Sequence, residues 1–126
     1  MALSTMELRY QREMTNAFIA ANPTVLELIP RIRVTDGRGT RWADDAPRFA
    51  QQLRIIDQSS SRTPQPGLIQ ASDGKERLAE FMLLGRHDAV MALWDHWTDA
   101  AGQAWELAQI FPWNQYEVRA QVIRRG

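Results

Sequence analysis

The sequence predicts a mainly β protein: a small β-barrel of about seven short strands preceded by one N-terminal amphipathic α-helix. The first observation behind this fold class is a change of period at Pro23. Apolar residues recur every three or four positions before it and every two positions after it. The second observation is that short apolar runs then alternate with turn sequences, a spacing typical of small barrels and sandwiches.

Size, charge and composition narrow the classes of function. The 126 residues suffice for one core, so we expect a single domain with the helix in residues 1–23 and the barrel in residues 24–126. Fifteen basic and fifteen acidic residues cancel, so no overall field favours nucleic acid or an anionic membrane. The chain has no cysteine, which excludes disulfides and thiolate metal sites. Without a membrane-length apolar run or a signal-peptide pattern, we expect synthesis in the cytoplasm and no membrane partner.

The N-terminal helix is the element that the sequence predicts most directly. Ser4 and Glu7 have the spacing of a capping box, in which two side chains satisfy free amide groups of the first turn. The helix should end at Asn22, because the residue before a proline is pushed out of the α region. We expect one apolar face to pack on the barrel or on a neighbouring subunit, formed by Met6, Tyr10, Met14, Ala17, Phe18 and Ala21.

A strand and a hairpin are expected after the helix. The alternating run over residues 24–34 places four apolar residues on one face: Leu26, Leu28, Ile32 and Val34. Pro30 interrupts this run, so we expect a bulge or an edge position there. The sequence Asp36-Gly37-Arg38-Gly39 predicts a hairpin turn. The next strand carries alternating apolar residues at Phe49, Leu53 and Ile55.

The second half of the chain predicts one long loop and a β-meander. Residues 57–74 are rich in serine and proline and predict a loop longer than a hairpin needs, with only a brief pairing at Leu68-Ile69. Residues 77–84 should form a strand buried on both faces, whereas residues 86–93 fit either a helical turn or an extended link. The meander is expected to run through residues 94–98, 105–111 and 116–122.

Histidine and acidic side chains show no catalytic pattern. His87-Asp88 and Asp95-His96 are adjacent pairs, but neighbours on a strand face opposite ways and no third ligand stands at metal-binding spacing. Asp44-Asp45 fits a solvated pair. Neither a nucleophile elbow nor a phosphate-binding glycine loop is present in the sequence. We therefore expect no enzymatic activity, no metal and no cofactor, with both histidines in surface or turn positions.

The five tryptophans divide by their positions. Trp97 and Trp105 lie on predicted strands and should fill the core. Trp113 lies in a Pro-Trp-Asn turn, where burial within the monomer is difficult. A tryptophan that its own fold cannot bury often anchors a partner.

Residues 92–126 carry a resemblance to a known family. An aspartate enters a strand, and a glycine turn, an aromatic-acid-aliphatic strand and a final strand follow: Leu93-Trp94-Asp95-His96-Trp97-Thr98, Gly102, Trp105-Glu106-Leu107-Ala108-Gln109-Ile110 and Asn114-Gln115-Tyr116-Glu117-Val118-Arg119-Ala120. This pattern resembles the C-terminal meander of head-to-tail connector proteins of long-tailed phages and prophages, and is most similar to the stopper, or head-completion, type. The Leu-Arg-Tyr-Gln-Arg sequence of residues 8–12 resembles a form found in actinobacterial phages. Trp94 stands where the family usually places a glycine.

The resemblance implies a structural virion protein of the head–tail neck, assembled in the host cytoplasm. Such a subunit would join a homo-oligomeric ring, a hexamer or a dodecamer, that seals packaged DNA in the head. Portal or adaptor proteins would lie on the head side, and tail-terminator or tail-tube proteins on the tail side. The ring would provide the docking surface for the tail.

Candidate contact residues follow from this implied ring, because a closed ring needs two different patches on each copy. The first candidates are Met14 and Phe18 on the helix, and Trp113 and Tyr116 at the last turn. The long loop is a further candidate that would line the channel, touch packaged DNA or meet the next ring, through Ser59, Ser61, Arg62, Pro64 and Pro66.

Two functions from other classes stay open. A small nucleic-acid-binding β-barrel would stack bases on exposed aromatic side chains and would need a basic groove beside them. A zinc- or histidine-based hydrolase would need a complete set of ligands or a base with its nucleophile. The balanced charge disfavours the first, and the missing third ligand disfavours the second.

Overall fold

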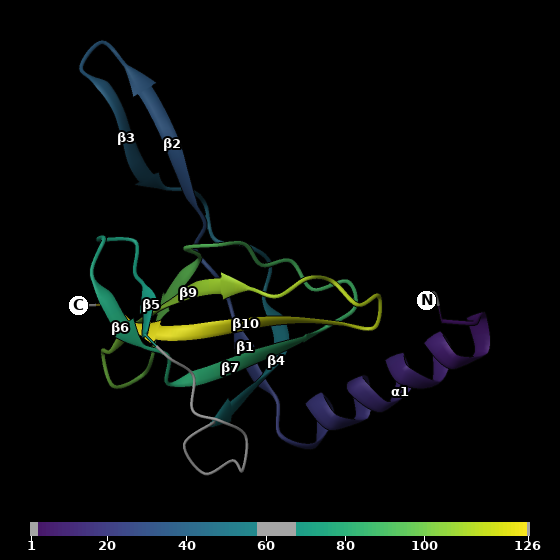
Figure 1. Ribbon diagram of the computed structural model, residues 1–126. Helices are drawn as coiled ribbons and strands as arrows, with labels where there is room; N and C mark the ends of the chain where they lie inside the picture. Colours follow the sequence, from purple (N-terminus) through teal and green to yellow (C-terminus); the bar gives the residue numbers. More distant parts are fainter. Residues whose placement is uncertain (1–2, 58–67, 126) are drawn as a thin grey trace.

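The computed structural model describes residues 3–57 and 68–125 (Figure 1). Its helix is α1 (Thr5–Ala21). The strands are β1 (Thr24–Leu26), β2 (Arg31–Asp36), β3 (Gly39–Asp44), β4 (Gln51–Asp57), β5 (Leu68–Gln70), β6 (Glu76–Leu78), β7 (Phe81–Arg86), β8 (His96–Thr98), β9 (Ala104–Ile110) and β10 (Glu117–Arg124). The predicted fold class, a mainly β barrel behind one N-terminal helix, is confirmed, although the described residues form ten strands rather than about seven.

Six strands form one antiparallel sheet in the order β1-β4-β7-β10-β9-β8. Its two edge strands approach each other where Ile29 and His96 exchange backbone hydrogen bonds, with N–O distances of 2.8 and 3.0 Å. This bridge makes the sheet a nearly closed barrel. The predicted meander is present as β8, β9 and β10, with β9 paired to both neighbours.

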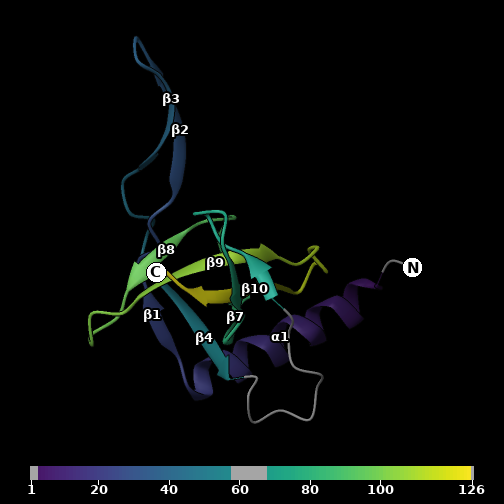
Figure 2. The ribbon, with the colours of Figure 1, turned by 60° about the vertical axis from the view of Figure 1, so that its left-hand side comes forward.

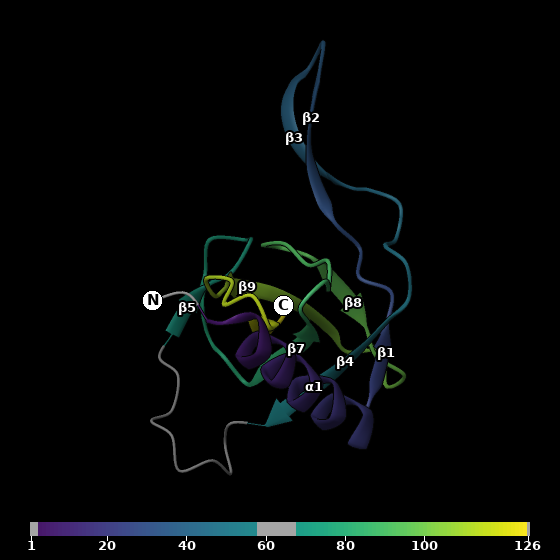
Figure 3. The ribbon, with the colours of Figure 1, turned by 90° about the vertical axis from the view of Figure 1, so that its right-hand side faces the viewer.

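Helix α1 packs against β4 and β7 (Figure 3). Ser4 accepts a hydrogen bond from the Glu7 amide at 3.1 Å, as expected for the helix cap. The packed side carries the buried Thr15 and Ile19, so the barrel does not bury the predicted apolar face. Both sides of the helix carry apolar residues and the barrel covers one, which leaves exposed Met6, Tyr10, Met14 and Phe18.

Strands β2 and β3 form a hairpin that projects away from the barrel (Figures 1 and 2). The predicted turn lies between Asp36 and Gly39. Pro30 divides the predicted run of residues 24–34, because the chain leaves the sheet after Ile29. The four apolar residues of that run therefore do not share one strand face: Leu28 is fully buried in the barrel, whereas Ile32 on the hairpin is 40% exposed.

The main core fills the inside of the barrel and consists of Leu28, Leu53, Leu83, Trp97, Trp105, Leu107, Ala120 and Val122. The prediction of one strand over residues 77–84, buried on both faces, is wrong for its first half: residues 76–78 form β6 of a separate hairpin, where Leu78 is 53% exposed. Burial on both faces is present in β7 from Met82 to Gly85. Gly85 is needed for this packing, since a Cβ at that position would lie 2.5 Å from the Cβ of Ala89. The close approach fixes residues 87–91 against the end of β7.

A smaller cluster lies against the β5–β6 hairpin and contains Ala71, Ala79, Ala108 and Ile123. The predicted pairing at Leu68-Ile69 is thus part of a hairpin, whereas residues 87–95 contain turns and no helix. The expectation for Phe49 is wrong: it precedes β4 and is 94% exposed. No helix in the described part of the chain is both long and apolar enough to span a membrane.

Candidate functional site

The acidic and histidine residues singled out in the sequence do not converge on one site. Among residues 3–57 and 68–125, no three histidine, aspartate or glutamate side chains could hold a metal ion together. Asp95 and His96 point to different partners, as expected for neighbours at a strand. Asp44 and Asp45 also separate, because Asp44 meets His96 while the carboxylate of Asp45 accepts the amide of Ala46.

Asp95 forms a buried ion pair with Arg48. The guanidinium donates from Nε to one carboxylate oxygen at 2.8 Å and from Nη2 to the other at 3.1 Å. The amide of Ala92 also donates to this carboxylate, at 3.0 Å. Asp95 is fully buried and Arg48 is mostly buried. This bidentate ion pair links the segment just before β4 to the turn just before β8.

His96 corrects the expectation of a surface role. Its side chain is only 6% exposed, and its Nε2 lies 2.8 Å from Oδ1 of Asp44 at the base of the projecting hairpin. Its backbone closes the barrel with Ile29. His87 is half-buried and its carbonyl oxygen accepts the indole N–H of Trp113 at 3.2 Å. Alternation within a short edge strand could not show that the hairpin base would return to cover His96.

Asp44 makes this contact sensitive to acid. The hydrogen bond with His96 is the largest cause that holds the pKa of Asp44 below its usual value. A carboxyl group with a lowered folded-state pKa adds stability above its unfolded pKa and loses it as the pH falls through the folded pKa. The thermal midpoint should therefore fall below about pH 4, and Asp44→Asn should reduce this fall.

Thermal unfolding followed by circular dichroism between neutral and acidic pH measures this effect. The fall should be reduced and not abolished, since the pKa values of Asp73 and Asp99 are also lowered, chiefly by hydrogen bonds with Arg77 and Trp105. Asp45→Asn serves as the control because it removes a carboxylate that has no histidine partner. An equal pH dependence in the two variants would contradict the role of Asp44.

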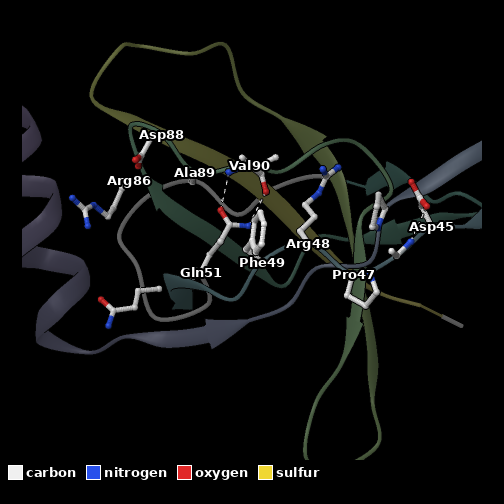
Figure 4. A pocket seen from close by; sticks show the side chains of 12 residues that line it. Asp45, Pro47, Arg48, Phe49, Gln51, Arg86, Asp88, Ala89 and Val90 are labelled. Carbon is white, nitrogen blue, oxygen red and sulfur yellow. Dashed lines mark hydrogen bonds between the residues drawn. The ribbon is translucent and has the colours of Figure 1, made fainter.

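A pocket with a volume of about 660 Å³ lies beside the base of the hairpin (Figure 4). Phe49 stands over it almost fully exposed, next to the half-exposed Val90. Gln51 bonds the backbone of Val90 twice, donating to its oxygen at 2.9 Å and accepting from its amide at 2.7 Å. These two hydrogen bonds hold Gln51 and Val90 together in the wall of the pocket, and Phe49 and Val90 give the pocket an exposed apolar side.

The tryptophans behave largely as predicted. Trp97 and Trp105 are buried in the core, and the ring of Trp105 meets Phe81 at a centroid distance of 5.0 Å. Trp113 is 60% exposed on the turn between β9 and β10. The sequence interpretation missed Trp42, which is 46% exposed on the projecting hairpin. The arginines that alternate on the opposite strand were the sequence signal that could have identified this residue as a candidate.

The helix and the last turn, the two predicted contact surfaces, lie at the same end of the molecule (Figures 1 and 3). Nε of Arg12 on α1 donates to the carbonyl oxygen of Gln115 at 2.9 Å, which ties them together. Met14 and Phe18 are about half exposed and Trp113 more so, while Tyr116 is partly buried. These two candidate surfaces therefore lie at one end of the molecule rather than on two separate sides of it.

The third group of candidates cannot be placed. Ser59, Ser61, Arg62, Pro64 and Pro66 lie outside the described residues. The described flanks of the predicted loop are the end of β4 and the start of β5. No protein-family model, curated protein or solved structure matches the chain.

Proposed function

We propose that the chain is a structural subunit of a phage head-to-tail connector, of the stopper or head-completion type. It forms a homo-oligomeric ring below the portal or adaptor ring, seals packaged DNA in the head and provides the docking surface for the tail. The observation that carries this proposal is helix α1, which is apolar on two sides. One side packs on the barrel through Ile19, and the other presents Met6, Tyr10, Met14 and Phe18 to solvent. Contiguous exposed apolar side chains of this kind mark protein contacts.

The backbone at Trp94 supports the resemblance behind the proposal. Trp94 has a φ of 72°, in the left-handed region that side chains other than glycine rarely adopt. The connector family usually places a glycine at this position. A tryptophan is tolerated here because its half-buried side chain packs against the cluster below the β5–β6 hairpin.

Deleting the gene from the phage or prophage that carries it tests the proposal. Loss of a stopper should give heads that have lost their DNA, together with free tails, because the head is neither sealed nor able to receive a tail. Electron microscopy and the amount of nuclease-protected DNA measure both effects, and the gene supplied in trans is the control. Normal virions from the deletion strain would overturn the proposal.

The second candidate is a small nucleic-acid-binding barrel, which the projecting hairpin favours. Trp42 lies between Arg31 and Arg33, whose guanidinium carbons are 5.9 and 5.5 Å from its ring centroid. An aromatic ring among arginines is the combination that binds single strands by stacking and charge. Salt-dependent binding of single-stranded DNA that Trp42→Ala removes would favour this candidate over the connector.

A further inference from the structure

We call the β2–β3 hairpin, residues 31–44, the arm. No other described part of the chain buries it. None of its residues is buried. A two-stranded hairpin alone is marginally stable and leaves two strand edges open. The arm is basic, since four arginines stand against two aspartates. Its chemistry therefore suits an acidic partner surface with a place for the Trp42 ring.

The barrel has an opening with matching properties, which we call the slot. It measures about 430 Å³ and lies between β1 and β8, beyond the bridge from Ile29 to His96. Residues of the two edge strands and of the turn after β8 form its walls, and aromatic core residues form its floor. The lining consists of Thr24, Val25, Leu26, Ile55, Phe81, Trp97, Thr98, Asp99, Ala100 and Trp105.

Backbone groups beside the slot lack a strand partner within the described residues. There β1 pairs with β4 alone, and β8 pairs with β9 apart from the single bridge at His96. The outer edges of Thr24–Leu26 and of residues 97–98 are consequently free to accept an extended chain. Added strands bind such edges through backbone hydrogen bonds, and a pocket for one side chain supplies specificity.

The charge at the slot complements the arm. Asp99 is the charged residue of the slot lining, which contains no basic residue. Its carboxylate also accepts hydrogen bonds from the Gln103 amide and the Trp105 indole, at 3.0 and 2.9 Å. The guanidinium carbon of Arg124 lies 5.5 Å from the ring centroid of Trp105, which lines the slot. Its charge is already paired with Glu80, with 2.9 Å between the charged atoms. The slot thus offers one carboxylate, that of Asp99, and no basic residue of its lining to the arginines that flank Trp42.

We infer that the arm of one copy lies along the free edges of β1 and β8 in the next copy, with Trp42 in the slot. The arm leaves the sheet just past the Ile29–His96 bridge, and the slot lies on the other side of that bridge. One copy therefore donates at one end and accepts at the other, as a head-to-tail ring requires. The inference rests on the proposed function and names the contact within the ring, which leaves the α1 end of each subunit for neighbouring rings.

Cysteine crosslinking of the full chain tests the contact, because the natural sequence has no cysteine. Thr40→Cys marks the arm two residues from Trp42, and Thr98→Cys marks the slot. Mixing the two proteins with a short bismaleimide should give a crosslinked heterodimer. Adding Trp42→Ala to the arm variant should lower the yield about tenfold, as expected for loss of a tryptophan anchor. Higher salt should also lower it.

Phe49→Ala is the matched control, since Phe49 is also exposed and aromatic but lies outside arm and slot. It should leave the yield unchanged. Glu76→Cys in place of Thr98→Cys measures random collision. A yield no higher than this background, or one unaffected by Trp42→Ala, would overturn the inference even if the deletion strain shows the connector phenotype. Specific crosslinking with normal deletion virions would instead reject the connector and retain the arm contact.

Discussion

Replacing Arg48 with methionine is expected to lower the free energy of unfolding by about 3–5 kcal/mol, the usual cost of breaking a buried ion pair from one side. Methionine keeps the apolar stem, so the loss reports the missing charge. The fully buried Asp95 would lose both hydrogen bonds from the guanidinium and keep the one from the amide of Ala92. Urea unfolding of the purified protein measures the change.

A surface pair provides the matched control for this result. Arg9 and Glu13 also form an ion pair, with 3.2 Å between the charged atoms, but their side chains are 81% and 65% exposed. Arg9→Met should therefore cost less than about 0.5 kcal/mol. Combining Arg48→Met with Asp95→Leu should recover much of the stability, because it removes both buried charges. If Arg48→Met alone resembles Arg9→Met, the pair does not hold the barrel end.

Local signals in the sequence were sufficient for most of the fold. The capping residues Ser4 and Glu7, the turn at residues 36–39 and the meander after Trp94 each depend on neighbouring residues only. Pro30 was identified as an interruption, but its consequence was not. Whether a chain continues in the same sheet or leaves it after a proline depends on which strand edge is free, and that is a property of the assembled barrel.

The contacts of the candidate surfaces depended on distant parts of the chain. The partner of His96 is 52 positions away in sequence, and the partner of Asp95 is 47 positions away. Periodicity gives the direction of such side chains relative to their own strand but not what covers them. The same limit applied to α1, where two apolar sides compete for one barrel and the sequence showed only the broader one.

The two sides of α1 predict opposite outcomes for two adjacent residues. Ile19→Ala should lower the free energy of unfolding by about 2–4 kcal/mol, since the side chain is 1% exposed and its loss leaves a cavity against the barrel. Phe18→Ala should cost less than about 1 kcal/mol. Phe18 is 44% exposed, and the guanidinium carbon of Arg54 lies over its ring, 3.7 Å from the centroid. Urea unfolding of both variants checks this difference.

Under the proposed connector function the order should reverse in the phage, because the exposed side of α1 would then face a neighbouring protein after assembly. Phe18→Asp should keep the purified protein folded and yet prevent joining of heads and tails. Ile19→Val, which removes one methylene, should cost about 0.5–1.5 kcal/mol and leave joining intact. Counting complete virions by electron microscopy after complementation of the deletion strain measures both effects. Complete virions from Phe18→Asp at the wild-type level would show that this apolar side contacts no neighbour in the neck.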